Sequence, residues 1–394
     1  MIPAVLPTYN RAPMAFVSGE GAWLTAEDGR RFLDLGAGIA VTLLGHANPA
    51  LVAALTDQAA KLWHVSNLYR IPGQEELAGR LVAATFADTA FFTNSGTEAC
   101  ELAVKMARKY WAAKGADRSE IVTVEGAFHG RSSAAIAASG GEKMVRGFGP
   151  LLPGFTHIPF GDWDALVAAV TDSTAAVLIE PVQGEGGIRP IPDATLRALR
   201  AACDATGTLL IFDEVQCGMA RTGKLFAHEW AGVTPDIMMV AKGLGGGFPL
   251  GAVLATENVA EPMTAGTHGS TYGGNPLAMA VGNAVMKIVA EPAFLAEVNR
   301  KAGLLRQKLE GLVAAHPDVF TGVRGQGLML GLLCKHPPAD IVKAGYDQGL
   351  LTVPAADNAL RLLPPLTITD EEIAEAVARL DRAAAALEAQ PATA

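Results

Sequence analysis

The stretch that decides the fold runs from "AAVLIEPV" (175–182) through "TLRALRAACDATG" (195–207) to "TLLIFDEV" (208–215). The two outer segments are apolar without alternation, so each reads as a strand buried on both faces. The segment between them favours a helix. Further runs at 120–126 ("EIVTVEG") and 236–243 ("DIMMVAKG") repeat the strand pattern, and "AFFTN" (90–94) precedes a helix-favouring stretch at 96–115. This alternation predicts an α/β fold with a mainly parallel sheet covered by helices on both sides.

Polar residues stand at the ends of these predicted strands. They are Asn94, Glu180, Asp213 and Lys242. In parallel α/β sheets, ligands bind beyond the carboxyl ends of the strands. We therefore expect these four side chains to converge on one rim of the sheet and to carry the chemistry of the protein.

A chain of 394 residues is too long for one simple core, so we expect two domains. The large α/β domain is predicted at 51–290 and a smaller α+β domain at 291–394. The segment 1–50 would join the smaller domain through a hairpin at 21–35. The last helix is predicted to begin with a capping box of Thr369 and Glu372 and a staple of Ile368 and Ile373. Residues 389–394 are predicted to form a loose tail.

The charge distribution argues against several partner classes. The chain has 31 basic and 40 acidic residues, a net charge of −9, and no block of like charges. This favours neither nucleic-acid nor anionic-membrane binding. The sequence has no run as long as a membrane span and no pattern of a signal peptide. Its cysteines are widely spaced, as expected for reduced thiols (Cys100, Cys203, Cys217 and Cys334). We expect a soluble, cytoplasmic protein.

Two further patterns do not support a nucleotide-binding or a metal site. "GMARTGKL" (218–225) imitates a phosphate-binding P-loop, but Leu225 stands where a magnesium-binding hydroxyl is needed. Its position is also not that of a loop between a strand and a helix start. The eight histidines include no His-x-x-x-His pair and no cluster with cysteine. We therefore predict no metal site.

The stretch "TNSGTEA" (93–99) is a candidate anion site. A strand ends there, and a helix begins near Thr97 after a short glycine-containing turn. The backbone N–H groups of Gly96 and Thr97, with the helix dipole behind them, could bind a phosphate. Plain N-capping by Ser95 or Thr97 is an equally good explanation of this motif taken alone.

Asp213 and Lys242 are the other two candidates for chemistry. Asp213 follows four apolar residues, where a carboxylate needs a cationic partner. That partner is either a buried arginine or the protonated ring nitrogen of a bound heteroaromatic cofactor. Lys242 ends another buried strand and precedes glycines that let a ligand approach the backbone. A phosphate site, a strand-end aspartate and a strand-end lysine together describe what pyridoxal phosphate requires of a protein.

Six stretches, in order along nearly the whole chain, resemble the signatures of the class III (ω-amino acid) pyridoxal-phosphate aminotransferases. They are "FFTNSGTEACELAVKMAR" (91–108), "FHGR" (128–131), "EPVQGEGG" (180–187), "LIFDEVQCGMARTGK" (210–224), "AKGLGGGFPLGA" (241–252) and "GSTYGGNPLA" (269–278). The resemblance implies fold type I: a large domain with a mainly parallel sheet and a smaller α+β domain.

The resemblance also implies how the cofactor is bound. Lys242 matches the lysine that forms a Schiff base with the cofactor and moves the proton, and Asp213 matches the partner of the ring nitrogen. Gly96 and Thr97 match the phosphate cup, and Phe128 matches the aromatic that stacks on the ring. The "DEVQ" turn adds Glu214, Val215 and Gln216, of which Gln216 matches the residue near the ring hydroxyl. Thr271 matches a phosphate ligand that comes from the other subunit of a homodimer.

Substrate residues follow in the same way. Arg131 resembles the arginine that grips the α-carboxylate of the ω-amino donor, and Ser270 lies at the substrate. Arg361, in "LRLLPP", resembles the arginine that binds the α-carboxylate of glutamate or 2-oxoglutarate. Glu185 resembles a switch that pairs with Arg361 while the donor is bound. The alternative is that Arg361 forms only a structural salt bridge, at the surface or between the domains.

Within the family, the compact length and the opening "YNRAPMAFVSGEGAWLTAEDGRRFLDLGAGIAV" (9–41) resemble the enzymes that act on N2-acetylornithine. The implied reaction moves its ω-amino group to 2-oxoglutarate and yields N-acetylglutamate 5-semialdehyde and glutamate, a step of arginine biosynthesis. Ornithine, succinylornithine, 4-aminobutyrate and a lysine derivative remain alternative donors. An aminomutase and a non-catalytic binding protein of this fold are the further alternatives.

Overall fold

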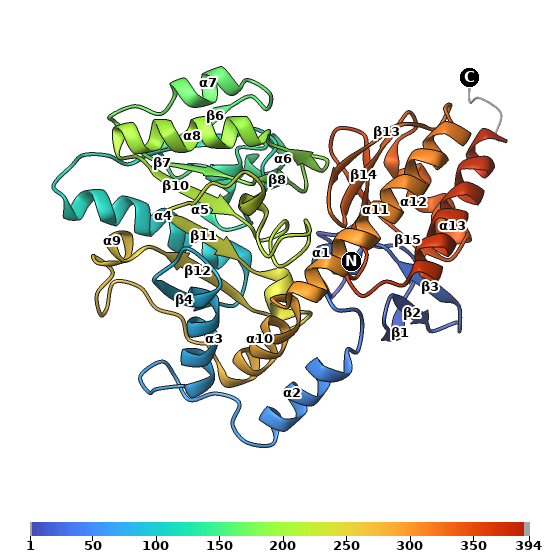
Figure 1. Ribbon diagram of the computed structural model, residues 1–394, viewed down its shortest axis with the longest axis horizontal. Helices are drawn as coiled ribbons and strands as arrows, with labels where there is room; N and C mark the ends of the chain where they lie inside the picture. The colour runs from blue at the N-terminus through green and yellow to red at the C-terminus, as the bar shows by residue number, and fades with distance from the viewer. Residues whose placement is uncertain (1, 390–394) are drawn as a thin grey trace.

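The structure is a computed structural model that describes residues 2–389. Its largest element is a seven-stranded sheet (Figure 1). In spatial order the strands are β4 (Thr89–Thr93), β12 (Gly251–Ala255), β11 (Ile237–Val240), β10 (Leu209–Asp213), β7 (Thr174–Ile179), β5 (Glu120–Val124) and β6 (Phe155–Ile158). Neighbours from β11 to β6 are parallel, whereas β12 is antiparallel to both β11 and β4. The predicted mainly parallel α/β sheet is confirmed.

The central strands are buried on both faces, as their apolar runs predict. Every residue of β7, β10, β11 and β12 is buried. Because successive strand residues point to opposite faces, Ile211 and Phe212 of β10 enter two different hydrophobic clusters. The first cluster includes Leu102 of α4 (Gly96–Ala113), and the second includes Leu199 of α8 (Asp193–Thr206). The sheet is therefore a middle layer between helices.

The remaining helices and strands of this part cover the sheet or connect its strands. They are α1 (Ala37–Ala40), α2 (Pro49–Ala59), α3 (Pro72–Ala83), α5 (Ser133–Ser139), α6 (Glu142–Val145), α7 (Trp163–Ala168), α9 (Glu257–Ala260), α10 (Pro276–Val289), the 3₁₀ helices η1 (Ala227–Trp230) and η2 (Lys242–Gly245), and the short strands β8 (Val182–Gln183) and β9 (Arg189–Pro190). Helix α7 packs on α8, and α10 packs on α2 and α3.

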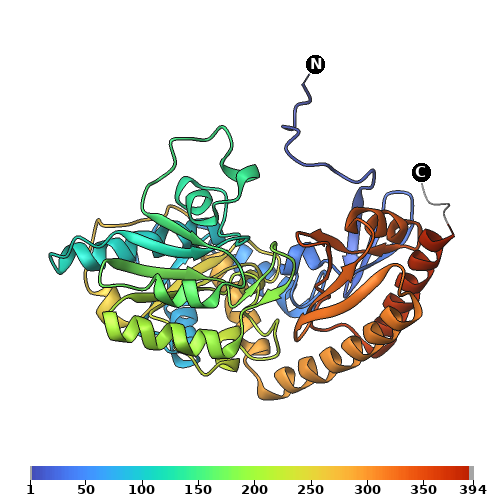
Figure 2. The ribbon, with the colours of Figure 1, turned by 90° about the horizontal axis from the view of Figure 1, so that it is seen from above.

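Two four-stranded sheets and three helices form a second part of the molecule (Figures 1 and 2). One sheet consists of β1 (Phe16–Glu20), β2 (Trp23–Ala26), β3 (Arg31–Asp34) and β15 (Leu350–Leu351); the other consists of β13 (Phe320–Gln326), β14 (Met329–Cys334), β17 (Ala359–Leu362) and β16 (Val353–Ala355). The helices are α11 (Pro292–Ala315), α12 (Pro338–Asp347) and α13 (Asp370–Glu388). Since Leu33 of β3 pairs with Leu350 of β15, both ends of the chain contribute to one sheet.

Local signals in this part were read correctly. The predicted hairpin at 21–35 is the antiparallel pair of β2 and β3. Helix α13 begins with the predicted capping box: Glu372 N–H donates to Thr369 Oγ1 at 3.1 Å, and Thr369 N–H donates to Glu372 Oε2 at 2.9 Å. Ile368 and Ile373 are both buried. Of the predicted tail, Ala389 caps α13, and residues 390–394 lie outside the described part of the chain.

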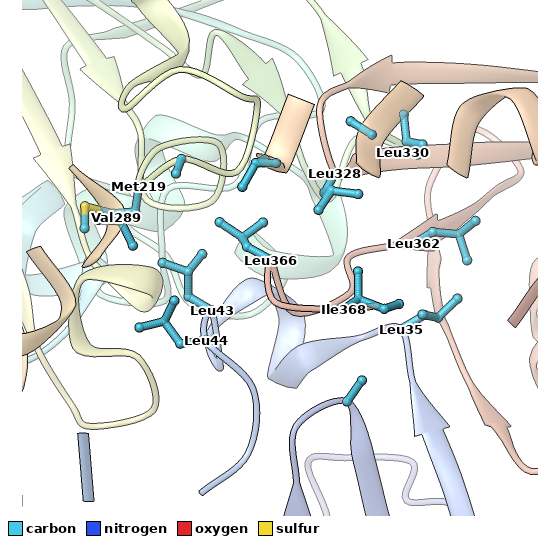
Figure 3. Close-up of a cluster of buried hydrophobic side chains, with 14 of the residues drawn as sticks. Leu35, Leu43, Leu44, Met219, Val289, Leu328, Leu330, Leu362, Leu366 and Ile368 are labelled. Atoms are coloured by element: carbon cyan, nitrogen blue, oxygen red, sulfur yellow. The ribbon is translucent and has the colours of Figure 1, made fainter. Parts of the chain in front are cut away.

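A continuous hydrophobic cluster joins the two parts (Figure 3). Leu43, Leu328 and Leu366 come from distant segments of the chain and pack in this cluster. The loop 218–225, which resembles a P-loop in sequence, lies buried beside it apart from the exposed Lys224, and precedes η1. Its Arg221 is fully buried and donates from Nη1 to the carbonyl oxygens of Leu328 at 3.1 Å and Pro364 at 2.6 Å. This loop therefore ties the large sheet to the strands around β17.

Among residues 2–389, no single helix is both long and apolar enough to cross a membrane. The pair α10 and α11 reaches that length and hydropathy only when the two are taken together across a bend of 71°.

Candidate functional site

A cavity of about 400 Å³ opens at the carboxyl ends of the large sheet's central strands. The predicted rim is confirmed, since the strand-end residues Asn94, Glu180, Asp213 and Lys242 all line it. Its walls also contain six other residues named from the sequence, Gly96, Thr97, Phe128, Arg131, Val215 and Gln216. The volume falls within the usual range of small-molecule sites.

Lys242 stands where β11 gives way to η2. Its backbone has a φ of 44°, in the left-handed region that L-residues rarely adopt. Gly246 and Gly247, with φ of 55° and 124°, then turn the chain back along the cavity. Such strain is typical of functional positions. It presents the lysine to the cavity instead of continuing the strand.

The surroundings of Lys242 favour a neutral amine. Burial lowers the pKa of Lys242, while the negative charges of Glu185, Glu180 and Asp213 work in the opposite direction without reversing the shift. A neutral amine is the nucleophilic form of lysine. The cavity therefore lowers the free energy needed to deprotonate this group.

Among the described residues, Asp213 is paired with a histidine and a backbone N–H group rather than with an arginine. Its Oδ1 accepts the N–H of Val215 at 3.0 Å, and its Oδ2 lies 2.7 Å from Nδ1 of His129. Burial by itself lowers the pKa of His129, but the hydrogen bond and charge of Asp213 outweigh it, and the net pKa is raised. His129 lies in the "FHGR" stretch, yet sequence reasoning gave it no role. The pairing spans 84 positions, so no local pattern reports it.

The start of α4 is N-capped by Ser95, whose Oγ accepts the N–H of Glu98, and it leaves the backbone donors that an anion site would need. The first intrahelical bond joins Ala99 N–H to the carbonyl of Ser95, so the N–H groups of Gly96 and Thr97 lie before it. A Cβ on Gly96 would lie 2.9 Å from a methyl of Val215, which shows how closely this turn packs against the segment after β10.

The Thr97 hydroxyl is engaged elsewhere. Its Oγ1 accepts the N–H groups of Arg131 and Ser132, each at 3.0 Å, and thereby fixes the "FHGR" loop. In that loop the Arg131 guanidinium lies 5.5 Å from the centroid of the Phe128 ring. Arg131 is exposed at the mouth of the cavity, where a substrate carboxylate can reach it.

Glu185 and Arg361 form an ion pair next to the cavity. The guanidinium Nη1 and Nη2 donate to the two carboxylate oxygens, the second at 3.0 Å. Arg361 is buried, and its Nη1 also lies 3.4 Å from Oε1 of Gln216, which lines the cavity. Neither member of the pair lines the cavity in this arrangement. Gln216 therefore lies between the ion pair and the cavity.

Three other candidates point away from the cavity. The Glu214 carboxylate is taken up by the N–H groups of Ala227 and His228, so only its backbone lies near the site. Ser270 and Thr271 line a separate hollow of about 340 Å³ on the same chain, which shares Asn94 with the cavity. Sequence order alone does not reveal such orientations, because they depend on distant partners.

The residues that line the cavity fit pyridoxal phosphate. An amine, a buried carboxylate for a ring N–H, an aromatic face and free helix-start N–H groups surround one space. These are the groups that the cofactor's aldehyde, ring nitrogen, ring face and phosphate each need. In the part of the chain that the structure describes, no cluster of three or more His, Cys, Asp or Glu could hold a metal ion.

Known proteins resemble this chain over its full length. It is 74% identical to acetylornithine aminotransferase of Rhodobacter capsulatus over 393 residues, covering 100% of both chains. The crystal structure of N-acetylornithine aminotransferase from Stenotrophomonas maltophilia matches with a TM-score of 0.85 and 42% identity, covering 97% of this chain and 98% of that one. Ornithine aminotransferase of Toxoplasma gondii, solved with PLP partly occupying its active site, matches with a TM-score of 0.93 and 31% identity over 98% and 93% of the two chains.

The match to a protein family is equally complete. The model of the class-III aminotransferases matches residues 6–384, which is nearly the whole chain. The predicted family, the fold type and the pyridoxal-phosphate cofactor are thereby confirmed. From these matches and the cavity geometry together, this chain belongs to the class-III aminotransferases, which use pyridoxal phosphate.

Proposed function

We propose that this protein transfers the ω-amino group of N2-acetylornithine to 2-oxoglutarate, giving N-acetylglutamate 5-semialdehyde and glutamate. The observation that carries the proposal is the full-length identity of 74% to an acetylornithine aminotransferase. The cavity supports it, because Lys242, Asp213 and Arg131 face one space large enough for cofactor and substrate. Ornithine, succinylornithine and 4-aminobutyrate are the rival donors.

The residues of the cavity divide the chemical work. Bound pyridoxal phosphate supplies an aldehyde for the amino group and a ring that withdraws electrons from the reacting carbon. Asp213, fixed in place by its hydrogen bonds to Val215 and His129, would hold a proton on the ring nitrogen. Lys242 Nζ, whose pKa is lowered by burial, would act as the base that takes a proton from the reacting carbon. It would then act as the acid that gives the proton back. Phe128 and Val215 both line the cavity and would supply apolar contacts to the ring.

The substrate is oriented by its carboxylate. The Arg131 guanidinium offers a planar pair of donors at the mouth of the cavity, which suits a carboxylate bound through both oxygens. In N2-acetylornithine the α-carboxylate lies at the opposite end from the ω-amino group. Gripping it at Arg131 would direct the amino group inward toward Lys242.

Replacement of Lys242 tests the reaction type. We expect Lys242→Ala to lower turnover by about 10³-fold, because proton transfer by a placed base is lost. Borohydride should attach the cofactor covalently to the wild-type protein and not to the variant, as read by intact mass. Lys224→Ala, an exposed lysine outside the cavity, is the matched control. A cofactor adduct that persists in Lys242→Ala would show that another amine carries it.

Substrate choice is tested by the first half of the reaction alone. The cofactor-loaded protein is mixed with N2-acetylornithine, ornithine, succinylornithine or 4-aminobutyrate, without an acceptor, and its visible absorbance is followed. We expect the fastest change with N2-acetylornithine, since its carboxylate and ω-amino group match Arg131 and Lys242. A clear preference for 4-aminobutyrate would leave the family intact and remove the substrate proposal.

We also propose that the pair of Glu185 and Arg361 adapts the site to two substrates. With the pair closed, Arg361 is neutralised and the donor binds without a second carboxylate site. A dicarboxylate acceptor such as 2-oxoglutarate would displace Glu185 and bind Arg361 instead. The partial exposure of the Glu185 side chain, 35% against 2% for Arg361, supports the glutamate as the moving member.

Removal of the Glu185 charge should change the two half-reactions in opposite directions. We expect Glu185→Gln to lower KM for 2-oxoglutarate about tenfold, or about 1.4 kcal/mol, because no ion pair must then open. The half-reaction with N2-acetylornithine should slow, because Arg361 stays charged and unpaired beside the donor. Glu257→Gln, an exposed carboxylate on α9, is the control. Equal effects on both half-reactions would rule out the switch.

We further propose a homodimer in which Thr271 and Ser270 of each subunit complete the other's site. Both residues lie outside the cavity of their own chain. Exposed apolar side chains lie nearby: Leu68 lines a hollow together with Ser270, and Tyr272 follows Thr271 in the chain. Asn67, within the same segment, donates to the carbonyls of Ser270 and Gly273. A patch of this kind favours a protein partner. The N-terminal arm projects from the body of the molecule in Figure 2, and its Leu6 and Tyr9 are exposed as well.

The assembly is tested by a charge placed in the patch. We expect the wild-type protein to sediment at twice the chain mass and Leu68→Glu to shift toward the monomer, since Leu68 is 87% exposed in the single chain. Cofactor affinity should fall in parallel, because each site loses the partner's Thr271. Gln307→Glu, exposed on α11, should stay dimeric. A monomeric wild-type protein with full activity would contradict the shared site.

We propose a cytoplasmic location. The four cysteines are buried and free of disulfides, as is typical of proteins in a reducing compartment. Cell fractionation with an antibody to the protein would test this.

A further inference from the structure

Glu180 is a buried carboxylate to which the proposed reaction assigns no task. It directly follows β7, is 4% exposed, and lines the floor of the cavity. Its two oxygens accept different backbone donors: Oε1 accepts Phe128 N–H at 2.9 Å, and Oε2 accepts Gly184 N–H at 3.0 Å. The two donors lie 52 residues before it and four residues after it. One side chain thus joins two loops that meet at the cavity.

The first loop carries the aromatic wall of the cavity. Phe128 heads the "FHGR" stretch, which also holds His129 against Asp213 and Arg131 at the cavity mouth. The Phe128 N–H is thus an anchor point for three residues that face the cofactor or the substrate.

The second loop carries Glu185. Gly184 packs on Gln216 so closely that a Cβ would lie 2.3 Å from the amide group of Gln216. The carbonyl of Gly184 accepts the N–H groups of Gly187 and Ile188, so the turn that follows is built on this residue. Glu185 is the next residue and pairs with Arg361. Displacement of Gly184 would therefore move Gln216 and the ion pair together.

We propose that Glu180 is a positioning residue whose ionised carboxylate clamps the Phe128 loop to the Gly184 loop and so aligns the aromatic wall with the Glu185–Arg361 pair. Only a carboxylate offers two equivalent acceptors at this separation. A glutamine would keep one carbonyl oxygen and set an NH₂ donor against the second N–H donor. An aspartate keeps the charge but is one methylene shorter and could not reach both loops.

Charged groups surround the clamp on every side. Those whose charges interact with Glu180 are His129, Asp213, Lys242, Arg189 and Cys217. Burial, and then the charge of Asp213, raise the pKa of Glu180 to about 7, while His129 and the two backbone N–H groups oppose the rise. Both N–H bonds are made to the ionised form. The clamp should therefore tighten as the pH rises through neutrality and loosen below it.

Hydrogen–deuterium exchange tests the clamp without any enzymatic turnover. In the cofactor-loaded protein, we expect Glu180→Gln to speed exchange at the Phe128 or Gly184 amide about tenfold, as the loss of one hydrogen bond to a charged group would do. Glu125→Gln, an exposed carboxylate in the preceding segment, should leave both amides unchanged. Unchanged exchange in Glu180→Gln, or an equal rise in Glu125→Gln, would overturn the proposal.

Two further measurements keep the test decisive if Glu180→Gln folds poorly. Glu180→Asp should speed exchange at one of the two amides and spare the other. In the unmutated protein, exchange at both amides, corrected for the intrinsic rate, should be slower at pH 8 than at pH 6. A protection that does not depend on pH would contradict an ionised clamp.

The effect of the clamp on substrate binding rests on the proposed function. It is measured by KM, separately from hydrogen exchange. Glu180→Gln should raise KM for N2-acetylornithine and for 2-oxoglutarate together, because one clamp aligns both carboxylate sites, while kcat changes less. If exchange at the two amides changes but both KM values stay the same, the clamp as an aligning device is overturned. If neither substrate is turned over by the wild-type protein, the proposed function fails while the exchange result still decides the clamp.

Discussion

A carboxylate at the end of a fully buried central strand is the constraint on which this structure depends. At the tip of β10, the Asp213 carboxylate is buried, and a buried polar group is costly unless hydrogen-bond donors surround it. Val215 and His129 supply them, and both come from segments that also wall the cavity. Supplying this carboxylate with donors thus requires the "FHGR" loop and the turn after β10 to be in place. The segments that donate hydrogen bonds to Asp213 are therefore also the walls of the cofactor site.

Lys242 presents the opposite problem on the neighbouring strand. Among the described residues, none forms a direct ion pair with Lys242. Burial therefore lowers the pKa of its amine. The two strands are parallel neighbours, so the Asp213 carboxylate and an amine of lowered pKa face the same cavity. A carboxylate and an amine that face one space are groups that can hold and move a proton at a reacting carbon.

Much of this could be predicted from the sequence, and the exceptions have a common cause. The apolar runs predicted the buried strands, and their last residues predicted the rim, because both signals are local. The capping box of Thr369 and Glu372 was likewise readable within four residues. The roles of His129 and Glu180 were not, since their contacts span 84 and 52 positions and leave no periodic pattern. The inward or outward direction of Glu214 and Ser270 also depends on distant partners that a single sequence does not reveal.

The pairing of β3 with β15 has a consequence for synthesis on the ribosome. Strand β3 ends at Asp34, and its partner in the sheet begins at Leu350. At about 5–20 residues per second, roughly 15–60 s pass before that partner is made. During this time the β3 edge of the ribbon is open, because Leu33, which is buried in the folded protein, lacks its strand partner Leu350. The nascent chain therefore offers a binding segment for chaperones near its N-terminus long before the active site exists.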